Sequence, residues 1–343
     1  MGKKIGILTF HEADNYGATL QAFALLKTVN KYADGEVINY HCQFILDQIK
    51  DVGQSSLPRK IIASLFKMNK HRAFNSFSRK NMALSQGYTG TTKNEMNGKY
   101  DLIFVGSDQV WNIECTNLDK TYFLDNIHDE TLISTYAASF GSGPYPGDEY
   151  SKLLRRFHVI SLREEKYIDK LEQVNSNIRV DVDPTMLLTD AEWKNYIKKA
   201  PISKKYVFVY LVGEQIDLLK KADEYARMNG CTVITNKKSP EFFLHCSPTD
   251  FLNWINFAEC VFTNSFHGTV FSILFHKKFT VECKIKGGYN NRASSLLGKT
   301  GLEFAMLEKW EEQENTDWNK VDKALKDMRE SSLNYLNETI SLA

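Results

Sequence analysis

The sequence predicts an α/β protein with two Rossmann-like domains that face a cleft, followed by C-terminal helices that pack back on them. Two observations support this fold class. Short apolar segments rich in β-branched residues alternate with segments of helical spacing, as is typical of a parallel sheet covered by helices. The alternation begins again near residue 206, after a polar stretch. Because ligands bind to such folds where strands end, we expect the functional residues in the turns that follow the strands.

The first half opens with a β-α-β unit. Residues 4–10 (KIGILTF) predict a buried strand, residues 19–29 a helix and residues 37–40 the next strand. The polar turn 11–18 would lie at the carboxyl end of the first strand, where doubly wound folds bind ligands. It contains no G-x-G-x-x-G motif, so we do not expect a dinucleotide site.

A basic segment follows, because residues 52–94 contain no acidic side chain. Within it, residues 59–81 predict a basic helix with interspersed apolar side chains. Such a helix can lie on an anionic membrane surface. It can equally pack on its own domain, which we favour because an apolar stripe on a surface helix usually faces the core. The basic residues are Arg59, Lys60, Lys67, Lys70, Arg72, Arg79, Lys80 and Lys93, and the apolar ones are Ile61, Ile62, Leu65, Phe66, Phe74 and Phe77.

The rest of the first half continues the alternation. A strand over 100–105 runs into the glycine-containing turn 106–112, where glycine permits a tight turn. Further strands are expected over 131–137, 159–162 and 180–183, and helices over 153–157 and 164–171.

The second half repeats this organisation after a boundary between residues 183 and 205. We expect strands over 206–211, 230–235 and 260–263, helices over 215–228, 248–258 and 269–275, and an irregular stretch over 236–247. A tail follows that is helical from about 317 to 342. The predicted domains are an N-terminal Rossmann-like domain (1–185), a C-terminal Rossmann-like domain (186–310) and a helical tail (311–343).

The turn 264–268 carries His267 to the mouth of the last of these helices. The first N–H groups of a helix point outward and favour an anion, and a titratable ring beside them is typical of an active site. The alternative is a turn that Asn264 or Ser265 caps, with His267 filling a gap. The local pattern leaves both interpretations open.

Composition and charge exclude several classes of protein. The chain has 343 residues, enough for two domains, and its 43% hydrophobic and 25% charged residues are usual for a globular protein. A net charge of +1 gives no reason to expect nucleic-acid binding. No apolar run reaches the roughly 18 residues of a membrane span, and the start MGKKIGILTF is too short for a signal peptide. We therefore expect a cytoplasmic protein.

The cysteines and the acidic and histidine residues predict no metal site. They fall at neither zinc nor calcium spacings. The six cysteines form no C-x-x-C pair, so we expect reduced, mostly buried thiols, and a nucleophilic cysteine is the less favoured alternative. They are Cys42, Cys115, Cys231, Cys246, Cys260 and Cys283.

Six motifs, taken together, resemble the polysaccharide pyruvyl transferase family. They are NYGATLQAFAL (15–25), DLIFVGSDQVWN (101–112), YAASFG (136–141), SLRE (161–164), DPTMLL (183–188) and TNSFHGTVFSILF (263–275). The resemblance spans about residues 4–300. It implies a GT-B-like fold and transfer of the pyruvyl group of phosphoenolpyruvate to a sugar as a cyclic ketal, usually during assembly of a surface polysaccharide. Phosphoenolpyruvate is then a co-substrate, and no further cofactor is implied.

The resemblance also implies a donor site. His267 matches the family's histidine, and we expect it to act as acid/base or as phosphate ligand. Histidine suits the acid/base role because the pKa of its side chain is near neutrality. Arg163 matches the arginine of the S-x-R motif, whose planar fork can hold a carboxylate or phosphate. The alternative for Arg163 is a salt bridge between domains. Asn264, Ser265 and Gly268 complete the expected donor-binding turn.

Two positions depart from the family pattern. Several members have an arginine two residues before the histidine, where this chain has Ser265, so another cation must hold the donor. Arg292 is our candidate, and Lys284 and Lys286 are weaker ones. Many members read N-x-G-D in the first turn, where this chain has Ala18. These departures indicate a branch of the family in which the acceptor differs, and with it even the donor is open.

The acceptor side is expected around the first two turns of the N-terminal domain. Asp108 is the candidate for activating a sugar hydroxyl, with helix capping as the alternative. For Trp111 we favour core packing over a sugar-stacking platform, and for His11 a hydrogen-bonded structural role over ligand binding. The remaining expected acceptor-binding residues are Asn15, Tyr16, Gly17, Gln21, Ser107 and Gln109.

The main hypothesis is therefore a pyruvyltransferase that acts on a lipid-linked or nucleotide-linked sugar. The basic helix 59–81 would hold it at the inner face of the membrane. One alternative is a GT-B-type glycosyltransferase that uses a nucleotide sugar. The other is a glycan-binding homologue that has lost catalysis.

Overall fold

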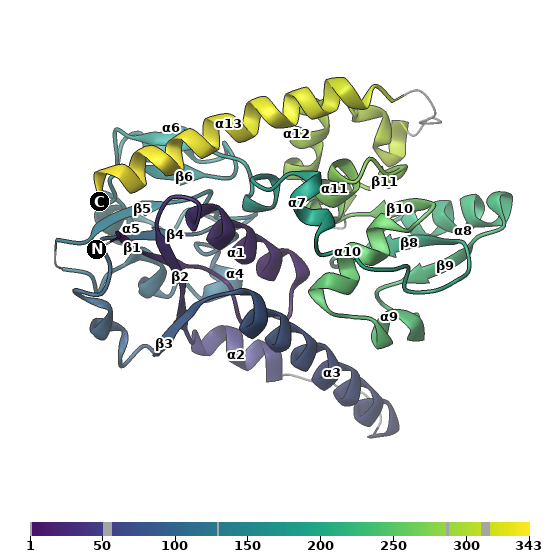
Figure 1. Ribbon diagram of the computed structural model, residues 1–343, viewed down its shortest axis with the longest axis horizontal. Coiled ribbons are helices and arrows are strands. Elements are labelled where there is room, and N and C mark those ends of the chain that lie inside the picture. Colours follow the sequence, from purple (N-terminus) through teal and green to yellow (C-terminus); the bar gives the residue numbers. More distant parts are fainter. Residues whose placement is uncertain (1, 51–56, 129, 286–287, 310–315) are drawn as a thin grey trace. The chain divides into compact units, whose positions relative to one another are not determined.

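The computed structural model describes residues 2–50, 57–128, 130–285, 288–309 and 316–343, which form two compact units (Figure 1). Unit 1 comprises Met1–Leu65, Phe74–Leu187 and Met328–Ala343, and unit 2 comprises Phe66–Ala73 and Leu188–Asp327. Each unit contains one main parallel sheet with helices packed on it. The predicted α/β fold with two Rossmann-like halves is therefore confirmed.

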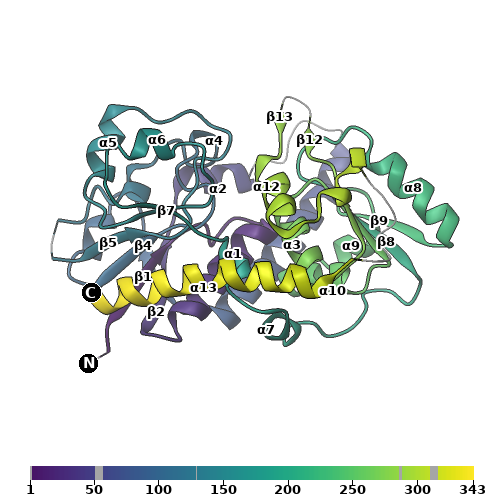
Figure 2. The ribbon, with the colours of Figure 1, turned by 90° about the horizontal axis from the view of Figure 1, so that it is seen from above.

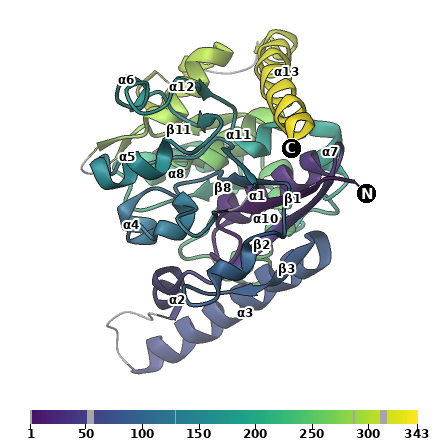
Figure 3. The same cartoon turned by 90° about the vertical axis from the view of Figure 1, so that its left-hand side faces the viewer.

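The main sheet of unit 1 has the strand order β3-β2-β1-β4-β5, part of which can be followed in Figure 3, and all its strands are parallel. This order reverses direction between β1 and β4. The turns after these two strands therefore flank the point at which doubly wound folds bind ligands. The strands are β1 (Lys4–Leu8), β2 (Asp34–Tyr40), β3 (Leu84–Tyr88), β4 (Leu102–Val105) and β5 (Leu132–Thr135), and β6 (Ile160–Leu162) pairs with β7 (Ile178–Val180) in a small parallel sheet.

Two helices of unit 1 begin at other residues than predicted, because side-chain hydrogen bonds fix their starts. Helix α1 begins at Tyr16, three residues earlier than predicted, because Asn15 caps it by accepting the N–H of Ala18. The predicted helix over 164–171 begins only at residue 168, since the Glu164 carboxylate accepts hydrogen bonds from Ser139 Oγ and Phe140 N. The helices are α1 (Tyr16–Val29), α2 (Gln43–Lys50), α4 (Ile113–Thr116), α5 (Asp148–Leu154) and α6 (Ile168–Leu171).

Several elements differ from prediction. Strand β3 and helix α2 were not predicted, because LSQGY lacks the apolar alternation of a strand and β3 pairs on one side only, at the edge of the sheet. Helix α5 lies earlier than the predicted 153–157, since Asp148 and Glu149 give it an acidic first turn. Strand β7 ends at Val180, where the predicted strand begins.

Unit 2 has the parallel strand order β11-β10-β8-β9, with the direction of winding reversed between β8 and β10. Helix α8 packs on β8 and β9 (Figure 2). A short helix, α9, occupies the stretch predicted to be irregular, with Pro240 in its first turn. The strands are β8 (Tyr206–Tyr210), β9 (Thr232–Thr235), β10 (Cys260–Thr263), β11 (Phe279–Val281), β12 (Lys284–Ile285) and β13 (Gly288–Tyr289). The helices are α7 (Asp190–Lys194), α8 (Leu218–Asn229), α9 (Pro240–Leu244), α10 (Pro248–Asn256), α11 (Phe266–Leu274) and α12 (Asn291–Thr300).

The C-terminal helix α13 (Trp318–Leu342) packs back on the sheets, as predicted. In unit 1, Tyr335 Oη donates to the Thr135 carbonyl at 2.7 Å and Ser332 Oγ donates to Asp181 Oδ1 at 2.8 Å. In unit 2, the ring of Trp318 stacks on that of His276, with centroids 4.6 Å apart. No helix in the described parts of the chain is both long and apolar enough to cross a membrane.

The basic helix α3 (Leu57–Asn81) contributes residues to both units. In unit 1 its Phe74 and Phe77 are buried and pack on Tyr16 and Phe23, as the packing interpretation predicts. In contrast, Leu65 and Met68 are 56% and 45% exposed. The side chains of residues 59–62 lie outside the described residues.

Candidate active site

The start of helix α11 is the candidate donor site in unit 2. Ser265 is the cap, and its Oγ accepts the N–H of Gly268 at 3.3 Å. The helix consequently begins at Phe266 rather than at the predicted Thr269. His267 therefore lies in the first helical turn and not in the preceding loop.

Gly268 allows this helix to lie close to strand β10. A Cβ atom at this position would come within 2.4 Å of Thr263 Oγ1, so a larger residue would force the helix away from the strand. The close approach of α11 to β10 depends on this contact. The observed role of Gly268 is thus close packing, and its predicted contact with the donor stays a prediction.

Asn264 holds the two turns at the switch point of unit 2 together. Its Oδ1 accepts the N–H of Val212 at 2.7 Å, and its Nδ2 donates to the Glu214 carbonyl at 3.0 Å. Its own carbonyl accepts a hydrogen bond from Asn290 Nδ2 at 2.9 Å. Asn264 therefore positions the turns after β8 and β10 and the start of α12.

His267 and Arg292 converge on the ring of Phe266. The imidazole centroid of His267 lies 5.3 Å from the Phe266 centroid, with the rings nearly perpendicular. The guanidinium carbon of Arg292, in the first turn of α12, lies 5.5 Å from the same centroid. His267 is 9% exposed. Lys284 is exposed, and Lys286 lies outside the described residues. The predicted acid/base and the predicted replacement cation thus both lie beside the ring of Phe266.

A buried glutamate occupies the other helix start at this switch point. Glu282, the residue after β11, is 1% exposed. Its Oε1 accepts the N–H groups of Asp217 at 2.6 Å and Leu218 at 3.1 Å, and its Oε2 accepts that of Ile216 at 3.0 Å. Glu282 was not predicted as a site residue, because no local motif marks it.

In unit 1, Arg163 forms a buried cluster with two carboxylates. Its Nη1 donates to Asp183 Oδ2 at 2.8 Å and its Nη2 donates to Asp108 Oδ1 at 3.1 Å. Burial lowers the pKa of Arg163, but the charges of Asp108 and Asp183 outweigh it and raise this pKa above its ordinary value. The salt bridge expected as the alternative for Arg163 exists, but within unit 1 and not between domains.

Asp108 has an unusual backbone conformation at the end of β4. Its φ is +70°, which few residues other than glycine adopt. Its Oδ1 also accepts the N–H of Gln109 at 2.9 Å, whereas Asn112 is the residue that caps the next helix. Asp108 does not cap α4, so the capping alternative is wrong. Ser107 Oγ donates to the Ala137 carbonyl at 2.7 Å.

The first turn of unit 1 places its predicted residues in different environments. Asn15 is exposed and caps α1, whereas Tyr16 packs on Phe74 and Gly17 is buried in the first turn of the helix. Gln21 is fully buried, and its Nε2 donates to Thr9 Oγ1 at 2.8 Å and to the Ala18 carbonyl at 2.9 Å. Gln21 therefore holds α1 against β1.

His11 is buried at the end of β1. Its Nε2 lies 2.8 Å from Asn39 Oδ1. Burial lowers the pKa of His11 below its ordinary 6.5, against the hydrogen bond to Asn39 and the charge of Glu12, which raise it. Beside it, His41 Nδ1 lies 2.6 Å from Glu12 Oε1. Neither Glu12 nor His41 was predicted, although His41 directly follows β2 and could have been found by its place at a strand end.

Trp111 belongs to the core of unit 1. Its side chain is fully buried, its Nε1 donates to the Tyr122 carbonyl at 2.9 Å, and its ring stacks on Phe123. A buried indole offers no face to a sugar. The structure thus shows the core packing that we favoured from the sequence.

A model of the polysaccharide pyruvyl transferase family matches residues 15–281, more than half of the sequence. The chain belongs to this family. It is accordingly a transferase, and the family assignment supports pyruvylation of a polysaccharide. A search of curated proteins finds no match.

The fold of this pyruvyl transferase family member is distantly similar to several solved structures. The UDP-N-acetylglucosamine 2-epimerase of Rickettsia bellii is 10% identical with a TM-score of 0.43, and each chain is covered completely. A putative UDP-N-acetylglucosamine 2-epimerase of Listeria monocytogenes is 10% identical with a TM-score of 0.48, covering 98% of this chain and 91% of that one. The UDP-GlcNAc 2-epimerase of Neisseria meningitidis, bound to UDP-GlcNAc, is 10% identical with a TM-score of 0.45, covering 98% and 94%.

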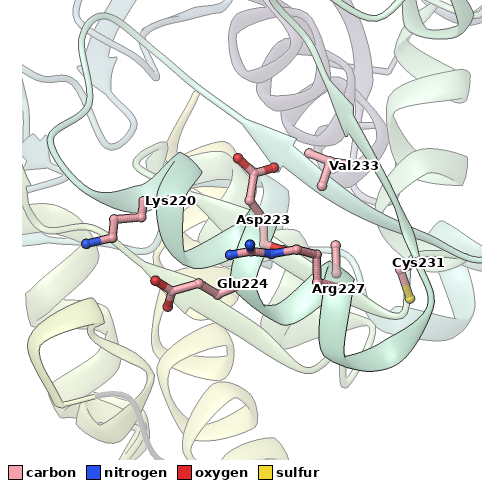
Figure 4. Close-up of a pocket in the computed structure, with 7 residues that line it drawn as sticks. Lys220, Asp223, Glu224, Arg227, Cys231 and Val233 are labelled. Carbon is pink, nitrogen blue, oxygen red and sulfur yellow. The ribbon is translucent and has the colours of Figure 1, made fainter.

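A surface pocket of about 610 Å³ lies elsewhere on unit 2, along α8 (Figure 4). Its lining includes side chains of both charges from α8, and it reaches Cys231 before β9, at the amino end of that strand. Burial raises the pKa of Cys231, which disfavours a reactive thiolate. Among the described residues, no group of three or more histidine, cysteine or acidic side chains could hold a metal ion. The lining residues are Lys220, Asp223, Glu224, Ala226, Arg227, Cys231 and Val233.

Proposed function

We propose that this protein transfers the pyruvyl group of phosphoenolpyruvate to a sugar of a surface-polysaccharide precursor and closes it as a cyclic ketal. The family assignment supports pyruvyl transfer in general. The assignment of phosphoenolpyruvate as the donor rests on one observation. His267 and Arg292 both lie beside the ring of Phe266 at the start of α11. An imidazole, a guanidinium and a helix start together suit a small, multiply charged anion.

Donor binding is proposed at this helix start. Phosphoenolpyruvate carries a phosphate and a carboxylate, and both are held well by N–H groups and by a planar guanidinium. Arg292 would take the place of the arginine that several family members have at the position of Ser265. The Ser265 hydroxyl oxygen accepts the Gly268 N–H, and the hydroxyl hydrogen is proposed to form a hydrogen bond to phosphoenolpyruvate.

The chemistry needs a proton donor at the enol carbon. A proton from His267 adds to C3 of the enol, and positive charge develops at C2. A sugar hydroxyl oxygen bonds to C2 and loses its proton to a base. A second hydroxyl of the same sugar then bonds to C2 and gives its proton to His267, which donated its own in the first step. The C2–O bond to phosphate breaks at the same time, and phosphate leaves with the electron pair and takes up the proton held by the base. The products are the cyclic ketal and phosphate.

Unit 1 is proposed to hold the acceptor, a lipid-linked or nucleotide-linked sugar. Asp108 is the proposed base for the sugar hydroxyl, and Arg163 holds its carboxylate in place from within the same unit. The exposed Asn15 is the proposed direct contact in the first turn, while Tyr16, Gln21 and His11 shape that turn from below.

Helix α3 is proposed to hold the protein at the anionic inner face of the cytoplasmic membrane. It combines basic residues with the exposed Leu65 and Met68. Neutralising Lys67 and Arg72 should weaken sedimentation with phosphatidylglycerol vesicles, and unchanged sedimentation would exclude this role.

Calorimetry with phosphoenolpyruvate tests the proposed donor. His267→Ala and Arg292→Ala should each weaken binding at least about tenfold, the equivalent of ~1.4 kcal/mol. His245→Ala and Lys299→Ala, at exposed positions of the same unit, are matched controls and should bind as the wild type does. A folded wild type that binds no phosphoenolpyruvate, with or without added sugars, would contradict the proposal.

A further inference from the structure

Unit 2 has two helix starts beside its switch point, and a protein carboxylate occupies one of them. Helix α8 follows β8 and helix α11 follows β10, and winding reverses between these two strands. In a doubly wound fold, the N–H groups at such helix starts are the usual binding position for a phosphate or diphosphate. At α8, three of these groups already bind Glu282.

Glu282 reaches this position from the opposite side of β10. It follows β11, and β10 lies between β11 and β8 in the sheet. Its backbone N–H donates to the Thr263 carbonyl at 3.0 Å, which fixes the residue to the end of β10. The side chain then extends to the N–H groups of residues 216–218. At 1% exposure, the carboxylate is enclosed there.

A phosphate group could not bind at the start of α8 while Glu282 is in place. Each N–H donates one strong hydrogen bond, and those of Ile216, Asp217 and Leu218 are already donated over 2.6–3.1 Å. A phosphate brought to the same place would also meet a like charge, which is a strong means of rejecting a wrong ligand.

We propose that Glu282 is a specificity residue that prevents the diphosphate of a nucleoside diphosphate from binding at the start of α8. The start of α11 then remains as the anion-binding helix start of unit 2. The protein thereby discriminates against nucleotide-sugar donors and in favour of a small anion. The identity of that small anion as phosphoenolpyruvate rests on the function proposed above, whereas the closure of α8 does not.

The test removes the carboxylate and supplies an anion. In Glu282→Ala the three N–H groups lose their acceptor, so inorganic phosphate at about 10 mM should raise the melting temperature of this variant more than that of the wild type. UDP should bind the variant at least about tenfold more tightly than it binds the wild type, as measured by calorimetry.

Asp250→Ala is the matched control. Asp250 Oδ2 accepts the N–H of Ser247 in the capping box of α10, so this variant also loses a carboxylate at a helix start in unit 2. It should lose stability without gaining affinity for phosphate or UDP. Glu282→Gln covers the case in which the alanine variant does not fold. Its neutral amide keeps the shape, and we expect about threefold tighter UDP binding from the lost repulsion alone.

Two results would overturn the proposal. One is a folded Glu282→Ala or Glu282→Gln variant whose responses to phosphate and UDP equal those of the wild type. The other is tight UDP binding by the wild type that neither variant changes. Phosphoenolpyruvate titrated into the same proteins separates the two proposals. Gain of UDP binding in a protein that never binds phosphoenolpyruvate supports the role of Glu282 and contradicts the proposed reaction. Phosphoenolpyruvate binding without any gain of UDP binding in the variants supports the proposed reaction and contradicts the role of Glu282.

Discussion

The starts of α8 and α11 are the same structural feature put to different uses. Both helices follow neighbouring parallel strands of unit 2. At α8, Glu282 accepts three N–H groups from a distant part of the chain. At α11, the local cap Ser265 accepts one, and His267 and Arg292 lie beside it. A helix start therefore indicates an anion site only when its N–H groups are not already bonded to a side chain of the protein.

The largest effect is expected at α11. His267→Ala should lower phosphate release from phosphoenolpyruvate, measured with a panel of glycoside acceptors, by about 100-fold or more, because general acid catalysis contributes on that order. His245→Ala should keep wild-type rates. Equal rates for His267→Ala and the wild type would remove the distinction between the two helix starts.

Removal of the carboxylate at α8 should give the next largest effect, on stability. Glu282→Ala leaves three N–H groups without their acceptor and should lower the free energy of unfolding by about 2–3 kcal/mol in urea titrations. A loss below about 0.5 kcal/mol would mean that water replaces the carboxylate at no cost, contrary to its burial.

Ser265→Ala is the corresponding change at α11. It removes a single local cap and should lower the free energy of unfolding by about 1 kcal/mol. The same urea titration compares it with Glu282→Ala. A decrease in the free energy of unfolding as large as that of Glu282→Ala would contradict a purely local role for this cap.

The smallest effect concerns a histidine in unit 1. Burial lowers the pKa of His11, so between pH 7 and 6 this histidine binds more protons in the unfolded chain than in the folded one. The free energy of unfolding should therefore decrease as the pH is lowered from 7 to 6, by at most about 0.7 kcal/mol for this group, given an unfolded pKa of 6.5. His11→Asn should lose this part of the pH dependence, and an unchanged pH profile would contradict it.

Much of the fold could be predicted because it depends on local pattern. Strand β10 lies where its apolar run predicts, and α13 differs from the prediction by one residue at its start. Some errors arose from local caps, as at the starts of α1 and α11, and others where a contact from elsewhere in the chain changed a boundary. Glu164, for example, bonds to residues after β5 and delays the start of α6.

The candidate site was predictable only in part. His267 was chosen because it matches the family's histidine, and Arg292 as a substitute for the arginine absent at Ser265. The structure places both beside the ring of Phe266, and their roles stay predictions. Glu12 and His41, which meet in the turns after β1 and β2, were missed because neither stands in a recognisable motif, although the place of His41 at a strand end could have marked it. For Trp111, the core packing that we favoured from the sequence is confirmed.

The sequence by itself determined the alternation of strands and helices and the family of the protein. These depend on neighbours within a few residues or on whole motifs. Only the tertiary structure decided which polar groups meet. Glu282 binds N–H groups 64 to 66 residues away, and Arg163 binds carboxylates 20 and 55 residues away. The order of strands in each sheet fixes such meetings, and no local pattern encodes that order.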